Sequence, residues 1–260
     1  MYAFDIERPT TIADAASALG GEAQALGGGQ TLIPTLKARL ASPEKLVSLS
    51  AIAEMKGICV DDNGQLHIGG ATVHADVAAD GTYAGLSGLA GQIGDPAVRS
   101  RGTIGGSIAN NDPSACYPAA ALGSAATIVT NSREIAADDF FQGMFETALD
   151  EGEIVIGVKF PIPEKSNYQK FVQPASRFAL VGVFVAKYAD GVRVAVTGAS
   201  NDGVFRWTEA EAALTANFDA SALDGLSVPS DDLIADLHGS PEYRAHLVKV
   251  MTGRAVTAAA

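Results

Sequence analysis

The sequence predicts an α+β protein made of two or three small lobes. The first observation behind this prediction is the alternation of short helical and strand-like segments over the opening fifty residues. The second is a pair of β-branched runs, Ala179–Tyr188 and Arg193–Ser200, joined by Ala-Asp-Gly, which is typical of a hairpin. The third is a series of helical patterns that closes the chain. With 260 residues and a 47% hydrophobic composition, the chain can bury more than one core.

The opening residues favour a βαβ unit. Thr10–Gly20 starts with a capping threonine, keeps apolar residues at helical spacing and stops at glycine, which predicts a short helix. Ala23–Leu26 is a short strand-like run that ends in three glycines, and Thr31–Leu40 resumes helical spacing. Lys45–Leu49 alternates apolar and polar residues like a strand. We therefore expect an N-terminal βαβ lobe at residues 1–52, with its most glycine-rich turn between a strand and a helix.

The remaining chain divides at a polar link. We expect a second lobe at residues 53–164 and a C-terminal unit at residues 165–260, because the Pro-, Lys- and Asn-containing segment Pro161–Asn167 reads as a boundary. In the second lobe the expected elements are strands at Gln65–Ile68, Ala126–Thr130 and Ile154–Phe160 and helices at His74–Ala79 and Pro118–Leu122. In the C-terminal unit the hairpin is followed by helices expected at Thr208–Thr215, Ser230–His238 and Pro241–Val256.

Composition excludes several classes of function. The net charge of −12 argues against nucleic acid and anionic membrane surfaces, both of which need clustered Lys and Arg. The sequence shows no basic leader before an apolar run and no membrane-length apolar stretch, so we expect a cytoplasmic protein. Two cysteines, Cys59 and Cys116, are too few to hold an iron–sulfur cluster or a structural zinc, and the four histidines lack metal-ligand spacing. We expect no bound metal.

The first candidate loop is Gly27–Pro34, with the sequence GGGQTLIP. Glycines between a strand and a helix permit positive φ angles and let backbone N–H groups approach an anion, and a helix N-terminus favours a diphosphate. A tight turn that needs glycine only for steric reasons explains the same pattern. The loop matches neither GxGxxG nor GxxxxGK[ST], so the common dinucleotide and triphosphatase fingerprints are missing.

The second candidate loop lies in the segment Arg99–Pro113, with the sequence RSRGTIGGSIANNDP. Its glycine pair is flanked by Thr and Ser hydroxyls, which suit phosphate, and the Asn and Asp that follow suit ribose or a ring edge. A glycine-rich turn capped by Asx residues is the alternative. Two such loops in one chain favour a dinucleotide, which is long enough to need more than one cradle.

Taken together, the two loops resemble those of a known family. GGGQTLIP and RGTIGGSIANNDP, in this order and about seventy residues apart, resemble the FAD-binding loops of the medium, flavin-carrying subunit of molybdenum hydroxylases. This family includes the carbon monoxide dehydrogenase medium chain and the FAD domain of xanthine dehydrogenase. Further similar segments are Phe4–Leu19, Ser132–Leu149, Glu153–Pro161, Tyr168–Val183 and the closing helix Tyr243–Val256.

The resemblance implies a set of contacts with a noncovalently bound FAD. Two segments would wrap the diphosphate, mainly through their backbone N–H groups: Gly27, Gly28, Gly29, Gln30, Thr31, Leu32, Ile33 and Pro34 in the first, and Thr103, Ile104, Gly105, Gly106 and Ser107 in the second. The other implied cofactor contacts are Ile93, Asn110, Asp112, Cys116, Val155 and Lys170. Lys170 would place an ammonium near the flavin, where it would stabilise an anionic reduced ring; a solvated surface lysine is the alternative. Gln30 and Cys116 stand where relatives carry His and Asp.

The resemblance also implies a fold and partners. The fold would be a two-lobed FAD-binding domain of the PCMH (vanillyl-alcohol-oxidase-like) type, followed by a smaller α+β C-terminal domain with an antiparallel sheet and helices. The chain would receive electrons from a small 2Fe-2S subunit in a complex with a large molybdopterin subunit, as a dimer of heterotrimers. It would pass them to NAD, a quinone or another external acceptor. No side chain would act as a catalytic acid, base or nucleophile.

Two other functions remain open from the sequence. One is a free-standing FAD oxidoreductase with its own substrate pocket, which would turn over a small reductant alone. The other is a non-catalytic nucleotide-binding module whose glycine loops bind another ligand or none. The resemblance implies that the substrate of the complex would be chosen on another polypeptide.

Overall fold

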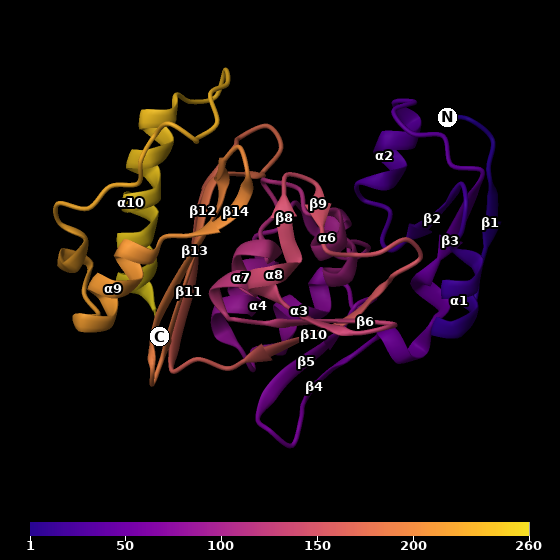
Figure 1. Ribbon diagram of the computed structural model, residues 1–260, viewed down its shortest axis with the longest axis horizontal. Coiled ribbons are helices and arrows are strands. Elements are labelled where there is room, and N and C mark those ends of the chain that lie inside the picture. The colour runs from indigo at the N-terminus through magenta and orange to yellow at the C-terminus, as the bar shows by residue number, and fades with distance from the viewer. Residues whose placement is uncertain (260) are drawn as a thin grey trace.

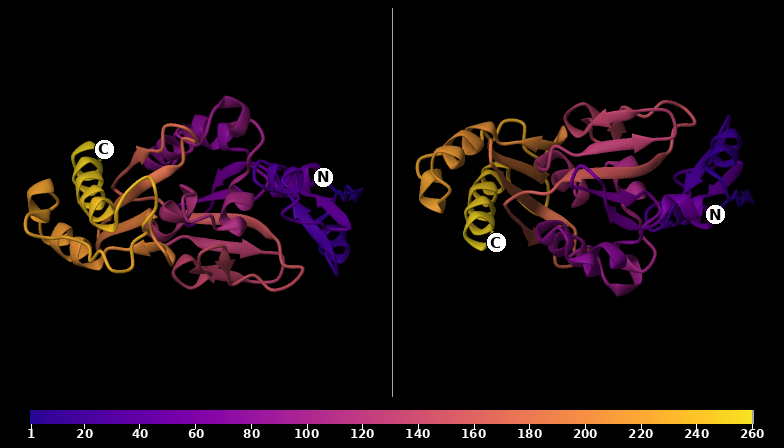
Figure 2. Two further views of the ribbon diagram at one scale, coloured as in Figure 1. Left: turned by 90° about the horizontal axis from the view of Figure 1, so that it is seen from above. Right: turned by 90° about the horizontal axis from the view of Figure 1, so that it is seen from below.

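A computed structural model describes residues 1–259. The chain runs from an N-terminal lobe at one end of the molecule, through a central region of strands and helices, to a sheet covered by helices at the other end (Figure 1). Views from above and below show the same order of the three regions (Figure 2). Within the described residues, no helix combines the length and the hydropathy needed to cross a membrane.

The N-terminal lobe is a small parallel sheet with two crossover helices. Strands β1 (Asp5–Glu7), β3 (Lys45–Ser48) and β2 (Ala23–Leu26) lie side by side in the order β1-β3-β2. Parallel neighbours need crossover connections, and α1 (Ile12–Ala18) and α2 (Leu32–Lys37) supply them. The Oγ1 atom of the residue before α1, Thr11, accepts from the Asp14 N–H at 3.1 Å and caps the helix as the sequence predicts. The predicted βαβ arrangement is confirmed.

The central region is an antiparallel sheet with helices packed on it. The strand order is β4-β5-β10-β6-β7, which places β10 (Val155–Pro161) between β5 (Gln65–Gly69) and β6 (Thr127–Thr130). The edge strands are β4 (Ile58–Val60) and β7 (Glu134–Ala136), and a small hairpin pairs β8 (Phe141–Gly143) with β9 (Glu146–Thr147). The helices are α3 (His74–Asp80), α4 (Ala84–Gly91), α5 (Pro96–Arg99), α6 (Ile104–Asn110), α7 (Tyr117–Gly123) and α8 (Ala137–Phe140).

The C-terminal unit is a four-stranded antiparallel sheet that is covered on both faces. Its strands, in order, are β11 (Lys165–Val172), β12 (Ala179–Tyr188), β13 (Gly191–Ser200) and β14 (Gly203–Arg206). Val183 and Val194 face the core under α9 (Thr208–Ala216) and α10 (Pro241–Ala258), whereas Phe184 and Ala195 belong to the central core. Burial on both faces explains why β12 and β13 read as nearly continuous apolar runs. The predicted α+β class, with an antiparallel sheet plus helices at the end, is confirmed.

Two sequence predictions need correction. The expected link Pro161–Asn167 is shorter than predicted, because β10 continues to Pro161 and β11 begins at Lys165. The helix expected at Ser230–His238 is wrong: Ile234 N–H donates to the Ala199 carbonyl at 2.8 Å, so this segment pairs with the end of β13. The Asp236 carboxylate also accepts from two N–H groups just after it and favours a turn. The boundaries at residues 52 and 164 stay predictions.

A buried arginine joins α10 to the C-terminal sheet. Arg244 is buried, and its Nη1 donates to the carbonyls of Leu180 and Gly198, both at 2.7 Å. Its Nη2 forms an ion pair with Asp236 at 2.8 Å. One side chain therefore satisfies carbonyls of two strands and fixes the turn that replaces the predicted helix.

We expect Arg244→Ala to lower the free energy of unfolding by about 3 kcal/mol, because two buried carbonyls lose their donor and a cavity is left. Urea unfolding of the full chain measures this change. Arg254→Ala, an exposed arginine on the same helix, is the matched control and should change stability by less than about 0.5 kcal/mol. Equal effects of the two substitutions would contradict the role given to Arg244.

Candidate functional site

A cleft of about 570 Å³ lies between the N-terminal lobe, the central region and the segment that joins β11 to β12. Its volume is in the range of small-molecule and cofactor sites. It contains most of the residues that the sequence singles out. Those that line it are Gly27, Gly28, Gly29, Gln30, Thr31, Leu32, Ile93, Thr103, Gly105, Gly106, Ser107, Asn110, Asp112, Cys116, Val155 and Lys170. Two loops far apart in the sequence thus share one cleft, as predicted.

Three of the predicted residues do not line the cleft. Ile104 is fully buried in the central core, where it anchors the start of α6. The Ile33 side chain packs beneath Gly29, and Pro34 is exposed one position further along α2. These residues shape the two loops from behind, and their side chains do not face the cavity.

The first glycine loop is packed directly onto the backbone of the second. A Cβ at Gly28 would overlap the carbonyl group of Arg101, and a Cβ at Gly27 would lie 2.9 Å from Thr103 Oγ1. Gly29 has a φ of +72°, in the left-handed region that favours glycine. Glycine is therefore required here for steric reasons, and the same close approach brings the two loops to one point.

The first loop offers free hydrogen-bond donors. Within residues 1–259, no acceptor is found for the backbone N–H groups of Gly28, Gly29, Gln30 and Thr31. The Gln30 side chain donates only to the Gly28 carbonyl, at 3.3 Å, and stays exposed. A run of unpaired N–H groups in a glycine turn forms a concave anion site. The first loop is therefore suited to an anion, and its contact with a diphosphate stays a prediction.

The second loop differs, because its N–H groups already have protein acceptors. Ile104 and Gly105 donate to the carbonyls of Thr72 and Gly70, at 3.1 and 2.9 Å. Gly106 donates to Thr103 Oγ1 at 3.2 Å, and Ser107 to the Thr103 carbonyl at 3.0 Å. This loop can offer a ligand the half-buried Ser107 hydroxyl, for which residues 1–259 provide no partner. Its backbone donors instead fix α6 to the central region.

Lys170 is not a fully solvated surface lysine, because its ammonium is held by groups of the protein; its place near the flavin stays a prediction. Its Nζ donates to the carbonyls of Gln92 and Arg177, at 2.7 and 2.9 Å, and lies 3.7 Å from the sulfur of Cys116. An ammonium group has three donors, and these contacts use all of them. Lys170 thus lines the cleft as a clamp between β11, the Ile93 loop and the segment before β12. Cys116 is buried behind it.

Two carboxyl groups line the cleft. Glu153 accepts from Arg133, Thr130, Ser132 and the Asp150 N–H, and the bond from Arg133 is the main reason that its pKa lies far below the ordinary value. Asp112 is half-buried and accepts from the Ser114 N–H at 2.8 Å; burial raises the pKa of its carboxyl. Glu153 is committed to Arg133, so Asp112 is the carboxyl of the two that is better placed to meet a ligand.

Sequence reasoning missed His74, which also lines the cleft. It is 5% exposed, its Nδ1 has no hydrogen-bond partner, and its ring lies 5.2 Å from that of Tyr117. Burial, with a smaller effect of Arg99, lowers the pKa of His74 to about 4, so the imidazole is neutral. The local sequence does not indicate that His74 lines the cleft, because only the fold brings this residue there.

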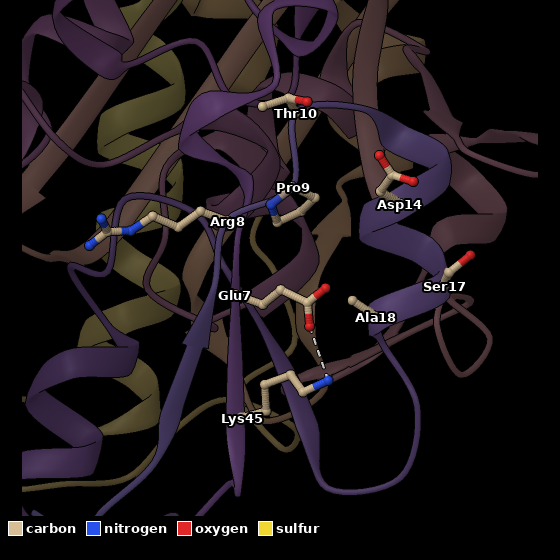
Figure 3. Close-up of a pocket in the computed structure, with 8 residues that line it drawn as sticks. All are labelled: Glu7, Arg8, Pro9, Thr10, Asp14, Ser17, Ala18 and Lys45. Atoms are coloured by element: carbon tan, nitrogen blue, oxygen red, sulfur yellow. Dashed lines mark ion pairs between the residues drawn. The ribbon is translucent and has the colours of Figure 1, made fainter.

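A second hollow lies on the N-terminal lobe and shares no lining residue with the cleft (Figure 3). Glu7 and Lys45 form an ion pair across it at 3.0 Å, while Arg8 points away from the other labelled side chains (Figure 3). None of the predicted site residues lines it. In the described part of the chain, no group of three or more His, Cys, Asp or Glu residues is arranged to hold a metal ion.

The fold and the cleft are those of a protein that binds a phosphate-containing dinucleotide. A family model described as the FAD binding domain in molybdopterin dehydrogenase matches residues 2–163, more than half of the chain, and the chain belongs to this family. The carbon monoxide dehydrogenase medium chain of Afipia carboxidovorans is 32% identical over 97% of this chain and 95% of its own length. The glyceraldehyde dehydrogenase medium chain of Sulfolobus acidocaldarius is 32% identical over 88% of each chain.

Solved structures agree with this assignment. A structure of reconstituted CO dehydrogenase from Oligotropha carboxidovorans superposes with a TM-score of 0.88 and 30% identity, over 98% of this chain and 97% of that chain. The predictions of the family, of the two-part α+β FAD-binding fold, of FAD as the cofactor and of a flavoprotein oxidoreductase subunit are therefore confirmed. The individual FAD contacts stay predictions.

We expect Lys170→Met to speed amide hydrogen exchange in residues 173–178, because the substitution removes the ammonium that holds the Arg177 carbonyl. It should also lower the free energy of unfolding by about 1–3 kcal/mol. Lys165→Met, on an exposed lysine of the same strand, should leave the exchange of this segment unchanged. Identical exchange in both variants would show that Lys170 is not a clamp.

We expect His74 to make the unliganded chain less stable in acid. Its folded-state pKa of about 4 lies below the ordinary 6.5, so its contribution is complete above about pH 6.5 and is lost as the pH falls towards 4. Between pH 7.5 and 5 this amounts to about 2 kcal/mol. In urea unfolding at both pH values, wild type should lose that much more stability than His74→Gln. Equal losses would mean that the imidazole is not held neutral.

Proposed function

We propose that this chain is the FAD-carrying electron-transfer subunit of a heterotrimeric molybdopterin-dependent hydroxylase or dehydrogenase. In this proposal it takes electrons from an iron–sulfur subunit and delivers them to an external acceptor. The observation that carries the proposal is the cleft in which two glycine loops meet and one of them presents unpaired N–H groups. Membership of the FAD-binding family supports it.

In this proposal the diphosphate of FAD lies at the junction of the two loops. The N–H groups of Gly28, Gly29, Gln30 and Thr31 would donate to its oxygens, and Ser107 would add a hydroxyl from the second loop. The overlap that a Cβ would cause at Gly28 supports a cradle built from backbone alone. The cleft volume of about 570 Å³ is compatible with a largely enclosed cofactor.

Other residues that line the cleft suit the flavin ring. Ile93 and Val155 offer apolar contact, and the Asp112 carboxyl and the Asn110 amide provide polar groups. When bound, FAD supplies the redox chemistry, and it needs no acid, base or nucleophile from the chain. The residues of the chain orient it, and the Lys170 clamp holds the wall formed by the Ile93 loop in place.

The partners are part of the proposal. Relatives are named as medium chains of carbon monoxide and glyceraldehyde dehydrogenases, which supports a complex with a large molybdopterin subunit and a small iron–sulfur subunit. We propose a dimer of heterotrimers whose external acceptor is NAD, a quinone or another small oxidant. The iron–sulfur clusters and molybdopterin would be carried by the partner chains. We also propose a cytoplasmic location, as the sequence leads us to expect.

The first experiment is the visible absorption spectrum of the chain purified with its partners, followed by heat release and identification of the chromophore. Flavin bands, about one FAD per chain and co-purified large and small subunits would support the proposal. A chain that stays colourless after reconstitution with FAD would overturn it in favour of a binding module. Turnover of a small reductant by the isolated FAD-loaded chain would instead favour a free-standing oxidoreductase.

The direction of electron transfer has its own test. The small subunit, reduced chemically and freed of excess reductant, is mixed without oxygen with the FAD-loaded chain. Bleaching of the flavin absorption is expected if the chain accepts electrons from that partner. An unchanged flavin spectrum beside a still-reduced cluster would contradict the proposed direction.

We expect Gly106→Val to abolish FAD retention, because Gly106 is exposed at the cleft and a branched side chain would occupy the space of the diphosphate. Equilibrium dialysis with FAD measures the loss. Gly88→Val is the matched control: this exposed helical glycine has open space around it, so FAD binding should persist. Full FAD occupancy in a folded Gly106→Val chain would remove the second loop from the site.

Gly105→Val tests a different property. A Cβ at Gly105 would lie 2.6 Å from the carbonyl oxygen of Gly70, so this substitution forces the backbone of the central region apart. We expect it to lower the melting temperature strongly, and its loss of FAD would follow from loss of the fold. A melting temperature close to that of wild type would contradict the steric role of Gly105.

A further inference from the structure

A buried histidine in the cleft lacks the hydrogen bonds that its burial demands. His74 is 5% exposed, yet its Nδ1 has no partner, and residues 1–259 provide no hydrogen bond to its Nε2 either. Buried side-chain polar atoms usually have at least one partner. An apolar side chain of similar size would fill this space without leaving a buried nitrogen unpaired. The ring therefore has the properties of a group kept for a ligand.

The backbone fixes this ring between the two glycine loops. The His74 N–H donates to the Gly102 carbonyl at 2.9 Å, and the residue before it, Val73, pairs with Thr103. Nε2 lies so close to Gly102 that a Cβ there would be 2.6 Å away. The Cβ position of Gly28 lies 2.7 Å from the Cα of the same Gly102. His74 thus reaches the point where the first loop lies on the second.

The burial of Nδ1 indicates which nitrogen of the neutral His74 ring carries the proton. Neutral imidazole carries one N–H and one lone pair. Nδ1 is enclosed and unpartnered, and an orphaned buried donor is rarer than an orphaned acceptor. The proton is therefore on Nε2, beside the residue Gly102 that lines the cleft. A neutral N–H donor is thereby added next to the free N–H groups of the first loop.

We propose that His74 binds the dinucleotide, with its Nε2–H donating to the diphosphate at the junction of the two loops. This inference rests on the proposed function, because it needs a phosphate-containing ligand in this cleft. Every donor placed at the junction, Nε2 included, is suited to an anionic oxygen and to no cation. The chemical class recognised is a nucleoside diphosphate moiety, which FAD shares with ADP and riboflavin lacks.

Two variants distinguish hydrogen bonding by His74 from simple packing of its ring. His74→Leu removes the donor and keeps most of the volume, whereas His74→Gln keeps an N–H near the position of Nε2. By isothermal titration, we expect His74→Leu to weaken the binding of FAD and of ADP about tenfold, which corresponds to one charge-assisted hydrogen bond. His74→Gln should restore both affinities to within about threefold of wild type. Riboflavin affinity should be equal in all three proteins.

A measurement on the unaltered chain covers the case in which a variant fails to fold. With ¹⁵N-labelled histidine, ADP should shift the imidazole nitrogen resonances of His74 and leave those of the exposed His238 unchanged. The inference would be overturned if folded His74→Leu bound FAD and ADP as tightly as wild type. It would also be overturned if the His74 resonances did not shift when ADP binds. Either outcome would leave the proposed function intact. Failure of the wild-type chain to bind either FAD or ADP would overturn both.

Discussion

The close approach of two glycine-containing backbones is the constraint on which the rest of this structure depends. Gly28 of the N-terminal lobe lies on the carbonyl of Arg101, and Gly105 at the start of α6 lies on the carbonyl of Gly70 in the central region. A Cβ at either position would force the two backbone segments in contact there apart. Because the contact is made by backbone, it leaves room at the junction for a ligand that is itself bound through backbone N–H groups.

The two loops have different functions in the site. The second loop uses its N–H groups to attach α6 to the central region, and this rigid base lets the first loop keep its own donors free. The C-terminal sheet contributes from the other side, since Lys170 on β11 ties the Ile93 loop and the segment before β12 into one wall. Phe184 on β12 packs into the central core, so the wall is continuous with the centre of the molecule. The cleft is thus a product of all three regions.

Local sequence patterns predicted the elements that depend on local physics. Thr10–Gly20 contains α1 with its threonine cap, and the runs that form β3 and β12 consist mostly of residues that the fold buries. Strand β11 was hidden because only Ser166 and Tyr168 are buried in it. The loops of the site were found by resemblance. The role of His74 depends on its contact with Gly102, 28 positions away, and that of Lys170 depends in part on its contact with Gln92, 78 positions away, which no local pattern encodes.

The most direct test is a crystal structure of this chain with FAD bound. We expect the diphosphate oxygens to lie within about 3 Å of the N–H groups of Gly28, Gly29, Gln30 and Thr31. We also expect the flavin ring to lie towards Ile93 and Val155. A diphosphate bound elsewhere, for example in the hollow between Glu7 and Lys45, with the N–H groups of the first loop facing only water, would contradict these expectations.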